Sequence, residues 1–218
     1  LKANPDYWEG APGLAEVHVI AIPDGEARVQ ALLTGQIDMN RYVPFAQKKI
    51  FDGNSKFKTT VVPTGNWRGM VMRTDTAPFD NPKVRKAVRM AVDRQELVDL
   101  VMGGAATVSC DTPVAPSDQY RLDMDCSQDI NGAKKLLSEA GYPNGIEMTI
   151  HVSTKEPTWP TIAEVMQQQL AKAGIKADIQ MTPSKSYWKE TWMKKAVAMT
   201  RWNERPADSI LHEAYHSG

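Results

Sequence analysis

Residues 81–104 read NPKVRKAVRMAVDRQELVDLVMGG, and this stretch carries the clearest structural pattern of the chain. In its first half, apolar residues recur on one side at helical spacing, and Asn81 followed by Pro82 is typical of a helix start. In its second half, Asp93 and Glu96 have the spacing of a capping box, and a pair of glycines marks the end. The stretch therefore predicts two consecutive helices.

Predicted strands and helices alternate on both sides of this stretch. Before it, residues 15–23 and 36–40 predict strands around a helix at residues 24–35, which gives a strand–helix–strand unit. Residues 59–73 are also extended, with an irregularity at Pro63. After it, helix and strand alternate twice more, at residues 129–141, 146–153, 161–174 and 175–181. The pattern predicts an α/β fold.

The composition is electrically balanced. The 218 residues include 26 Lys and Arg and 26 Asp and Glu, which gives no electrostatic basis for binding nucleic acid or an anionic membrane. Hydrophobic residues make up 42%, enough for the core of one large domain or two small ones. No apolar run reaches the roughly 18 residues of a membrane span. The first residues carry no signal peptide and are expected to come from the interior of a larger domain.

The two cysteines, Cys110 and Cys126, border a short loop rich in Pro, Asp and Ser. They lack the CxxC spacing of a metal or redox site. In a reducing compartment they would be free thiols, whereas in an oxidising one they could form a disulfide that stabilises the fold by about 3 kcal/mol. The residues themselves leave both states open.

A short motif near the end of the sequence, HEAYH, matches a zinc-protease signature. His212 and His216 would lie one turn apart on a helix, and Glu213 could act as general base. A catalytic zinc needs a third protein ligand, but the other histidines lie on strand-like stretches and only a serine and a glycine follow the motif. The motif is therefore interpreted as part of a surface helix that matches the signature by coincidence, and a zinc metalloprotease is the alternative. No nucleophile elbow or P-loop is present, and no enzyme is predicted.

Four blocks of the sequence resemble one protein family. They are residues 4–39, residues 77–98 (APFDNPKVRKAVRMAVDRQELV), residues 133–145 (AKKLLSEAGYPNG) and residues 199–218 (MTRWNERPADSILHEAYHSG). Together they are similar to the extracellular solute-binding proteins, family 5, of peptide-type ABC importers, the group of dipeptide-, oligopeptide- and nickel-binding proteins. In the fourth block PADS replaces a frequent Asp-Pro, so Asp208 is the nearest carboxylate. This departure weakens the inference that Asp208 binds an amino group, as an aspartate does in some peptide-binding members of the family.

The resemblance implies a fold as well as a family. The implied fold is an α/β lobe of the type II (cluster C) periplasmic-binding-protein class, with a mixed sheet flanked by helices. Such proteins have two lobes that close over a ligand, and the chain is expected to be a fragment centred on the second. Residues 1–60 would be part of lobe I, residues 61–212 would be lobe II, and residues 213–218 would start the return segment toward lobe I.

The resemblance also implies a function. The protein would capture short peptides or peptide-like solutes in the cleft between its lobes and deliver them to the transmembrane subunits of an ABC permease. Capture needs no catalytic residue, metal or cofactor. The protein would act as a periplasmic monomer, and secretion would favour a disulfide between Cys110 and Cys126. A fragment that contacts other proteins and binds no solute is a further alternative.

The first stretch expected to face the cleft is TGNWRGMV, residues 64–71. Trp67 could stack on the solute, and Asn66 or Arg68 could form hydrogen bonds with it. A position for Trp67 in the hydrophobic core is the alternative reading. This stretch therefore contributes three candidate ligand-binding residues.

The second stretch expected to face the cleft is TRWNERPAD, which follows the last predicted strand. Trp202 would be an aromatic residue on an extended loop, and Arg205 could hold a carboxylate or phosphate through two hydrogen bonds. A surface ion pair of Arg205 with Glu204 or Asp208 is the alternative. Asp208 and Arg201 are further candidates for contact with the solute.

Other prominent residues are expected to be structural. Tyr187, Trp188 and Trp192 would pack in the core, since the two tryptophans have i, i+4 spacing. Arg85 and Asp93 belong to the signature of the second block, but on capped helices their simplest role is to hold the fold.

Overall fold

The computed structural model of the chain describes residues 1–62, 64–154 and 156–216. Pro63, where the sequence predicts an irregularity, and residues 217–218 lie outside the described ranges. The chain divides into two compact units, Leu1–Thr59 and Thr60–Gly218. No helix in the described ranges is long and apolar enough to cross a membrane.

The first unit contains two helices. They are the α-helix α1 (Gly25–Leu33) and the 3-10 helix η1 (Phe45–Ile50). Asp24 caps α1 by accepting a hydrogen bond from a backbone amide of the first turn at 2.8 Å, which satisfies one of the free amides of a helix start. Val29 on α1 and Phe51 after η1 are buried. The unit thus has a small core of its own.

The two strands predicted around α1 are not formed, and this part of the prediction is wrong. Residues 15–23 make one isolated bridge, between Glu16 and Lys2, and residues 36–40 make none in the described structure. A strand needs a neighbour for its backbone hydrogen bonds, and no strand of the first unit provides one. The apolar side chains of the first segment are correspondingly exposed, Val19 by 83%.

The second unit is built on a four-stranded sheet in the order β1-β4-β2-β3. The strands are β1 (Trp67–Met72), β2 (Ile146–Ser153), β3 (Ile175–Thr182) and β4 (Val197–Trp202). β2 is parallel to β3 and to β4, whereas β1 is antiparallel to β4. The sheet is therefore mixed, as the family resemblance implies.

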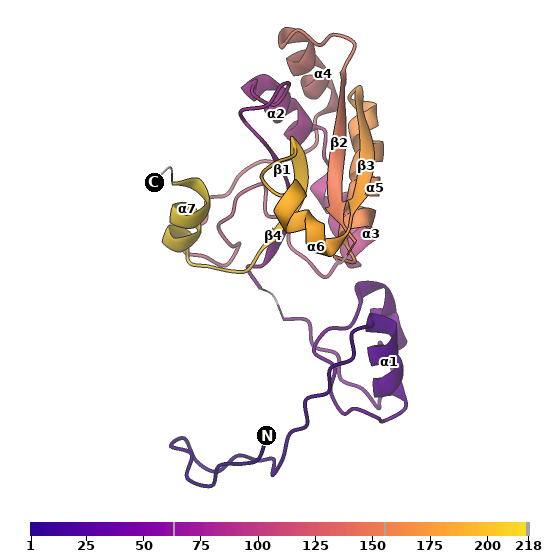
Figure 1. Ribbon diagram of the computed structural model, residues 1–218, viewed down its shortest axis with the longest axis vertical. Helices are drawn as coiled ribbons and strands as arrows, with labels where there is room; N and C mark the ends of the chain where they lie inside the picture. Colours follow the sequence, from indigo (N-terminus) through magenta and orange to yellow (C-terminus); the bar gives the residue numbers. More distant parts are fainter. Residues whose placement is uncertain (63, 155, 217–218) are drawn as a thin grey trace. The chain divides into compact units, whose positions relative to one another are not determined.

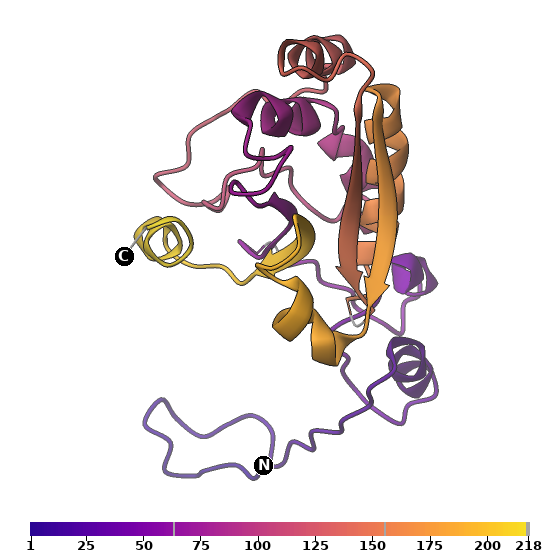
Figure 2. The same ribbon diagram turned by 45° about the horizontal axis from the view of Figure 1, so that its top comes forward.

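Helices flank this sheet (Figures 1 and 2). α5 packs against β2 and β3, α3 packs against α5, and α2 packs against α4. Their bounds are α2 (Pro82–Met90), α3 (Arg94–Met102), α4 (Ile130–Glu139), α5 (Trp159–Lys172), α6 (Ser184–Ser186), the π-helix η2 (Tyr187–Thr191) and α7 (Ala207–Tyr215). The boundary expected at residue 212 falls inside α7, and the assignment of lobes stays a prediction.

The core of the second unit lies between the sheet and α5. Along β2, Ile146, Met148 and Ile150 are buried, while Glu147 and Thr149 between them are exposed. This alternation turns one face of the strand toward α5, where Leu170 is also fully buried. Burial of such side chains contributes about 1.5–3 kcal/mol each.

The two helices predicted from residues 81–104 are confirmed. Asn81 accepts a hydrogen bond from the amide of Lys83 at 2.9 Å, and Asp93 accepts one from the amide of Glu96 at 3.0 Å. The guanidinium of Arg85 donates to the carbonyl oxygen of Phe79 at 2.6 Å, a contact that agrees with the structural role expected for it. These contacts fix where α2 and α3 begin.

A disulfide joins Cys110 to Cys126 in the loop between α3 and α4. Beside it, the Asp111 carboxylate accepts hydrogen bonds from Arg89 at 2.8 Å and from Arg94 at 2.5 Å. Burial raises the pKa of Asp111, but these two hydrogen bonds outweigh it and hold the pKa below its ordinary value. The disulfide thus closes the loop on itself, and the ion pairs of Asp111 tie the loop to α2 and α3.

Candidate functional site

One edge of the sheet gathers the residues singled out in the sequence. β2, β3 and β4 all end at this edge, and β1 begins there, since Trp67 pairs with Trp202 in the register. In open α/β sheets, ligands bind outside the carboxyl ends of the strands. The edge therefore has the position expected for a binding site.

An aromatic pair lies at this edge. The rings of Trp67 and Trp202 are stacked, with centroids 6.3 Å apart and planes inclined by 18°. The side-chain oxygen of Asn66 accepts a hydrogen bond from the amide of Glu204 at 2.7 Å, which holds the start of β1 to the segment after β4. Trp202 thus ends a strand, and the extended loop predicted for it is wrong. Both tryptophans are partly exposed, so Trp67 is not a fully buried core residue.

A shallow pocket of about 250 Å³ opens beside the aromatic pair, lined by Trp188, Arg201, Trp202, Asn203 and Arg205. The Arg201 Nε donates to Glu156 Oε1 at 2.9 Å. Arg205 Nη1 lies 2.6 Å from Glu213 Oε2, so the partner predicted for its ion pair, Glu204 or Asp208, is wrong. The reason is that α7 folds back and brings Glu213 to Arg205. The pocket is therefore lined by two ion-paired arginines and by aromatic rings.

Arg68 adds a third cation near this pocket. It stands directly opposite Arg201 in the register of β1 and β4. Its pKa is lowered, first by burial and then by the charge of Arg201, while the charge of Glu156 raises it. Asp208 is exposed in the first turn of α7 and does not line the pocket. The structure thus gathers all the predicted candidates except Asp208.

Only some of the aromatic residues before β4 lie in the core. Tyr187 is fully buried, and its hydroxyl donates to the carbonyl oxygen of Met199 at 2.5 Å. Burial raises the pKa of Tyr187 far above its ordinary value. Trp188 packs edge-on against Tyr187 and Trp159 but is 45% exposed and lines the pocket, so its prediction as a core residue is wrong. No spacing in the sequence distinguishes it from Tyr187.

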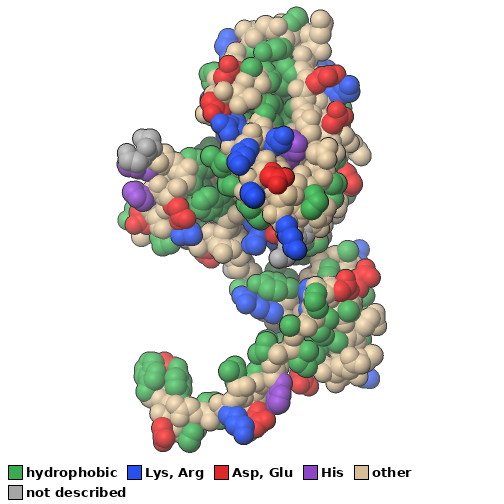
Figure 3. Space-filling model, in the orientation of Figure 1, with side chains coloured by type: hydrophobic (Ala, Val, Ile, Leu, Met, Phe, Trp, Pro, Cys, Tyr) green, Lys and Arg blue, Asp and Glu red, His purple; other side chains and the backbone are tan. Residues whose placement is uncertain are grey.

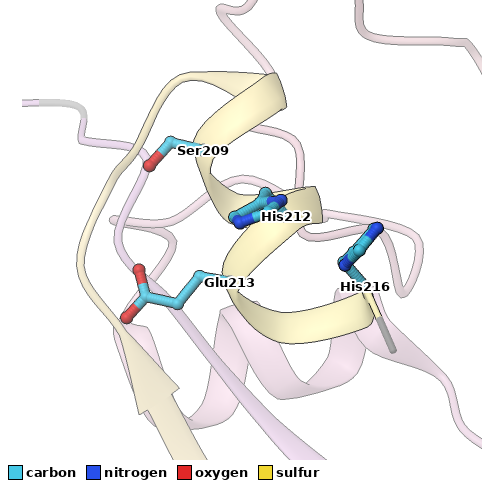
Figure 4. Close-up of a pocket in the computed structure, with 4 residues that line it drawn as sticks. All are labelled: Ser209, His212, Glu213 and His216. Carbon is cyan, nitrogen blue, oxygen red and sulfur yellow. The ribbon is translucent and has the colours of Figure 1, made fainter. Parts of the chain in front are cut away.

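The HEAYH motif lies on α7, as Figure 4 shows. The rings of His212 and His216 are stacked with centroids 4.9 Å apart, and both line a hollow of about 590 Å³ with Ser209 and Glu213. Glu213 points away from His216 toward its ion pair with Arg205. Within the described ranges, no group of three His, Cys, Asp or Glu side chains could hold a metal ion. The third ligand that a zinc protease needs is not provided by this part of the chain.

Known relatives match the chain over most of its length. It is 34% identical over 181 residues to the glutathione-binding protein GsiB of Escherichia coli (strain K12), which covers 82% of this chain and 35% of the relative. The chain thus spans about a third of the length of that relative.

Solved structures show the same architecture. The periplasmic binding protein DppA of Helicobacter pylori, in complex with the peptide STSA, has a TM-score of 0.75 and 26% identity, covering 96% of this chain and 42% of that one. The binding protein AgaA of A. tumefaciens R10, in complex with agropinic acid, has a TM-score of 0.76 and 28% identity, covering 94% and 43%.

A family model matches nearly the whole sequence. The model for bacterial extracellular solute-binding proteins, family 5, middle region, covers residues 1–217. That family binds solutes and does not transform them, and the fold, the sheet edge and the relatives agree with it. The chain belongs to the family 5 bacterial extracellular solute-binding proteins.

Proposed function

We propose that this chain is part of the solute-capturing component of an ABC importer, and that it takes up short peptides or peptide-like solutes. The observation that carries the proposal is the cluster of aromatic and cationic side chains at the carboxyl edge of the sheet. Glutathione is the first solute to test, because relatives one-third identical over 181 residues are named for binding it.

Each candidate residue has a proposed task. The rings of Trp67 and Trp202 offer flat apolar surfaces for a side chain or peptide plane. Arg68 and Arg205 supply N–H donors for oxygen atoms of the solute. Asn66 acts by holding the segment after β4 in place through its bond to the amide of Glu204. Asp208 has the weakest support, because it lies outside the pocket lining.

Capture and delivery follow from differential binding. A solute that contacts both lobes stabilises the closed form over the open form, and the permease then receives the closed complex. We propose that this takes place outside the cytoplasmic membrane, in the periplasm, with the protein as a monomer and without a cofactor. Secretion to that compartment would allow the Cys110–Cys126 disulfide to persist.

Native mass spectrometry tests the proposal on the purified protein, as this chain and as the longest product of its gene. After incubation with glutathione and a tetrapeptide library, a peptide-sized adduct at one per protein is expected. Trp202→Ala should weaken that adduct by at least about tenfold, since aromatic anchors dominate binding energies. Tyr120→Ala is the control, because this exposed ring does not line the pocket.

The same spectra separate the alternatives. A stoichiometric zinc adduct that His216→Ala removes would revive the metalloprotease. A protein that carries neither solute nor metal, in both forms, would favour a fragment that only contacts other proteins. A mass two hydrogens below that of the reduced protein would report the disulfide.

A further inference from the structure

The helix α7 begins after Pro206, a residue that has no side-chain oxygen to cap it. The free backbone amides of its first turn therefore need acceptors from elsewhere. Asp118 supplies one from a distant loop, because its Oδ2 accepts a hydrogen bond from the amide of Ala207 at 3.2 Å. A carboxylate at this end also interacts favourably with the helix dipole. Asp118 thus caps α7 across a sequence separation of 89 residues.

The helix is packed on one side and at its start. Ala207 and Ile210 are buried, whereas residues 211–216 are exposed. Figure 3 shows α7 at the margin of the second unit, with hydrophobic side chains between it and the rest of that unit. The exposed half carries Glu213, which reaches back to Arg205 at 2.6 Å. The place of Arg205 at the pocket therefore depends on how the first turn of α7 is held.

The loop that carries Asp118 is restrained in two ways. The disulfide joins Cys110 to Cys126, and Asp118 lies between them. Within the loop, the guanidinium of Arg121 donates to two backbone carbonyl oxygens, each at 2.8 Å, and Ala115 is buried. A closed loop has fewer conformations than an open one. The closure and these contacts together keep the Asp118 carboxylate beside α7.

We infer that Asp118 is a positioning residue for the pocket, and that the Cys110–Cys126 disulfide keeps it in place. Asp118 fixes the first turn of α7, and α7 sets Glu213, which orients Arg205. The structure of α7 then depends on the state of the cysteines. A dithiol reductant, itself oxidised to a disulfide, would convert them to two thiols and release the loop. The effect on α7 is independent of any solute, whereas the effect on the pocket rests on the proposed function.

Hydrogen exchange followed by mass spectrometry tests the inference on the purified chain and on the longest product of its gene. Asp118→Ala removes the oxygen that caps α7. We expect the hydrogen-bonded amides of α7 to exchange about two- to thirtyfold faster, the range expected for the loss of a helix cap. Exchange in β2 should stay unchanged. Asp125→Ala is the matched control, because this exposed carboxylate of the same loop contacts Ser127, two positions away.

A double-mutant cycle tests the role of the disulfide. Replacing both Cys110 and Cys126 by serine should speed exchange in α7 by a similar factor. Adding Asp118→Ala to that variant should then change little, because Asp118 has already lost its position. Reduction of the unchanged protein with dithiothreitol should reproduce the effect. If the serine variant does not fold, which fast exchange in β2 would reveal, Asp118→Ala with the disulfide intact still decides whether Asp118 fixes α7.

The outcomes separate this inference from the proposed function. Unchanged exchange in α7 of Asp118→Ala would overturn the inference, and so would full additivity of the two changes, since Asp118 would then act without the disulfide. Glutathione and tetrapeptide affinities should fall about two- to thirtyfold in Asp118→Ala. Faster exchange with unchanged affinity would overturn the link from α7 to the pocket. Faster exchange in a protein that binds none of these solutes in any form would support the role of Asp118 and contradict the proposed capture.

Discussion

Gln169 offers the sharpest test of how the second unit is held together. Its side chain lies on α5 and is 1% exposed. Its oxygen accepts a hydrogen bond from the amide of Asp93 at 3.1 Å, and its nitrogen donates to Asp93 O at 3.1 Å and to Glu96 Oε2 at 2.6 Å. One amide side chain thus binds α5 to the start of α3. Replacing it by leucine keeps the approximate volume and removes all three bonds.

The magnitude follows from the groups that lose a partner. In Gln169→Leu, the Asp93 amide becomes an unsatisfied donor, at a cost of about 1–3 kcal/mol. The carboxylate of Glu96 loses a hydrogen bond that is worth about 1.5–3 kcal/mol, although it is half-buried and can regain part of this from water. We expect unfolding to become easier by about 3 kcal/mol. For a unit of this size, the melting temperature falls by roughly 6–12 °C.

Urea unfolding followed by tryptophan fluorescence measures this change, because five of the six tryptophans lie in the second unit. The matched control is Gln168→Leu, a neighbour on the same helix whose side chain is exposed and whose replacement should change stability by less than about 0.5 kcal/mol. If the two variants unfold at the same urea concentration, the network contributes nothing and the reasoning is refuted.

Two further predictions concern charge and backbone. Asp111 has a lowered pKa in the folded state, so its ion pairs stabilise the fold above the unfolded pKa, and this stability is lost as pH falls through the folded pKa. Asparagine tolerates the positive φ of 59° at this position. Asp111→Asn should therefore lower the free energy of unfolding at pH 7 and make it depend less on pH between pH 5 and pH 2. Urea midpoints measured across that range would show both effects. Gly145→Ala would push a Cβ into the carbonyl oxygen of Gly174 at a φ of +88° and should cost about 3 kcal/mol. Gly141→Ala, with a φ of +91° and open space, should cost about 1 kcal/mol in the same assay, and equal effects would contradict the steric argument.

The parts of the fold that the sequence predicts well are those encoded by local signals. Asn81 and Asp93 cap the helices they were expected to cap, since the hydrogen bond joins residues two or three positions apart. The strand predicted at residues 146–153 has the observed bounds, because its alternation matches burial on one face. The full capping box did not form. Gln169, from a distant helix, takes the place of Glu96 at the Asp93 amide, and no short spacing reveals such a contact.

The strands predicted in the first unit show the opposite limit. Residues 15–23 have the alternation of a strand, but alternation only makes a segment suitable for a sheet. Whether a sheet forms depends on a partner strand, and within the first unit the only bridge of this segment joins Glu16 to Lys2. Local pattern and tertiary outcome therefore differ here for a physical reason that the sequence of the segment does not contain.

The candidate site depends on the register between strands that are far apart in the chain. β1 and β4 pair so that Arg68 stands opposite Arg201, and like charges in directly opposite positions destabilise an antiparallel pair. Glu156 contacts Arg201 at 2.9 Å and offsets part of this repulsion. A sheet edge with a purely structural role would be more stable with one of these arginines neutral. Positions where local consistency fails are expected at functional sites. This mismatch supports the proposal that the solute binds at this edge of the sheet.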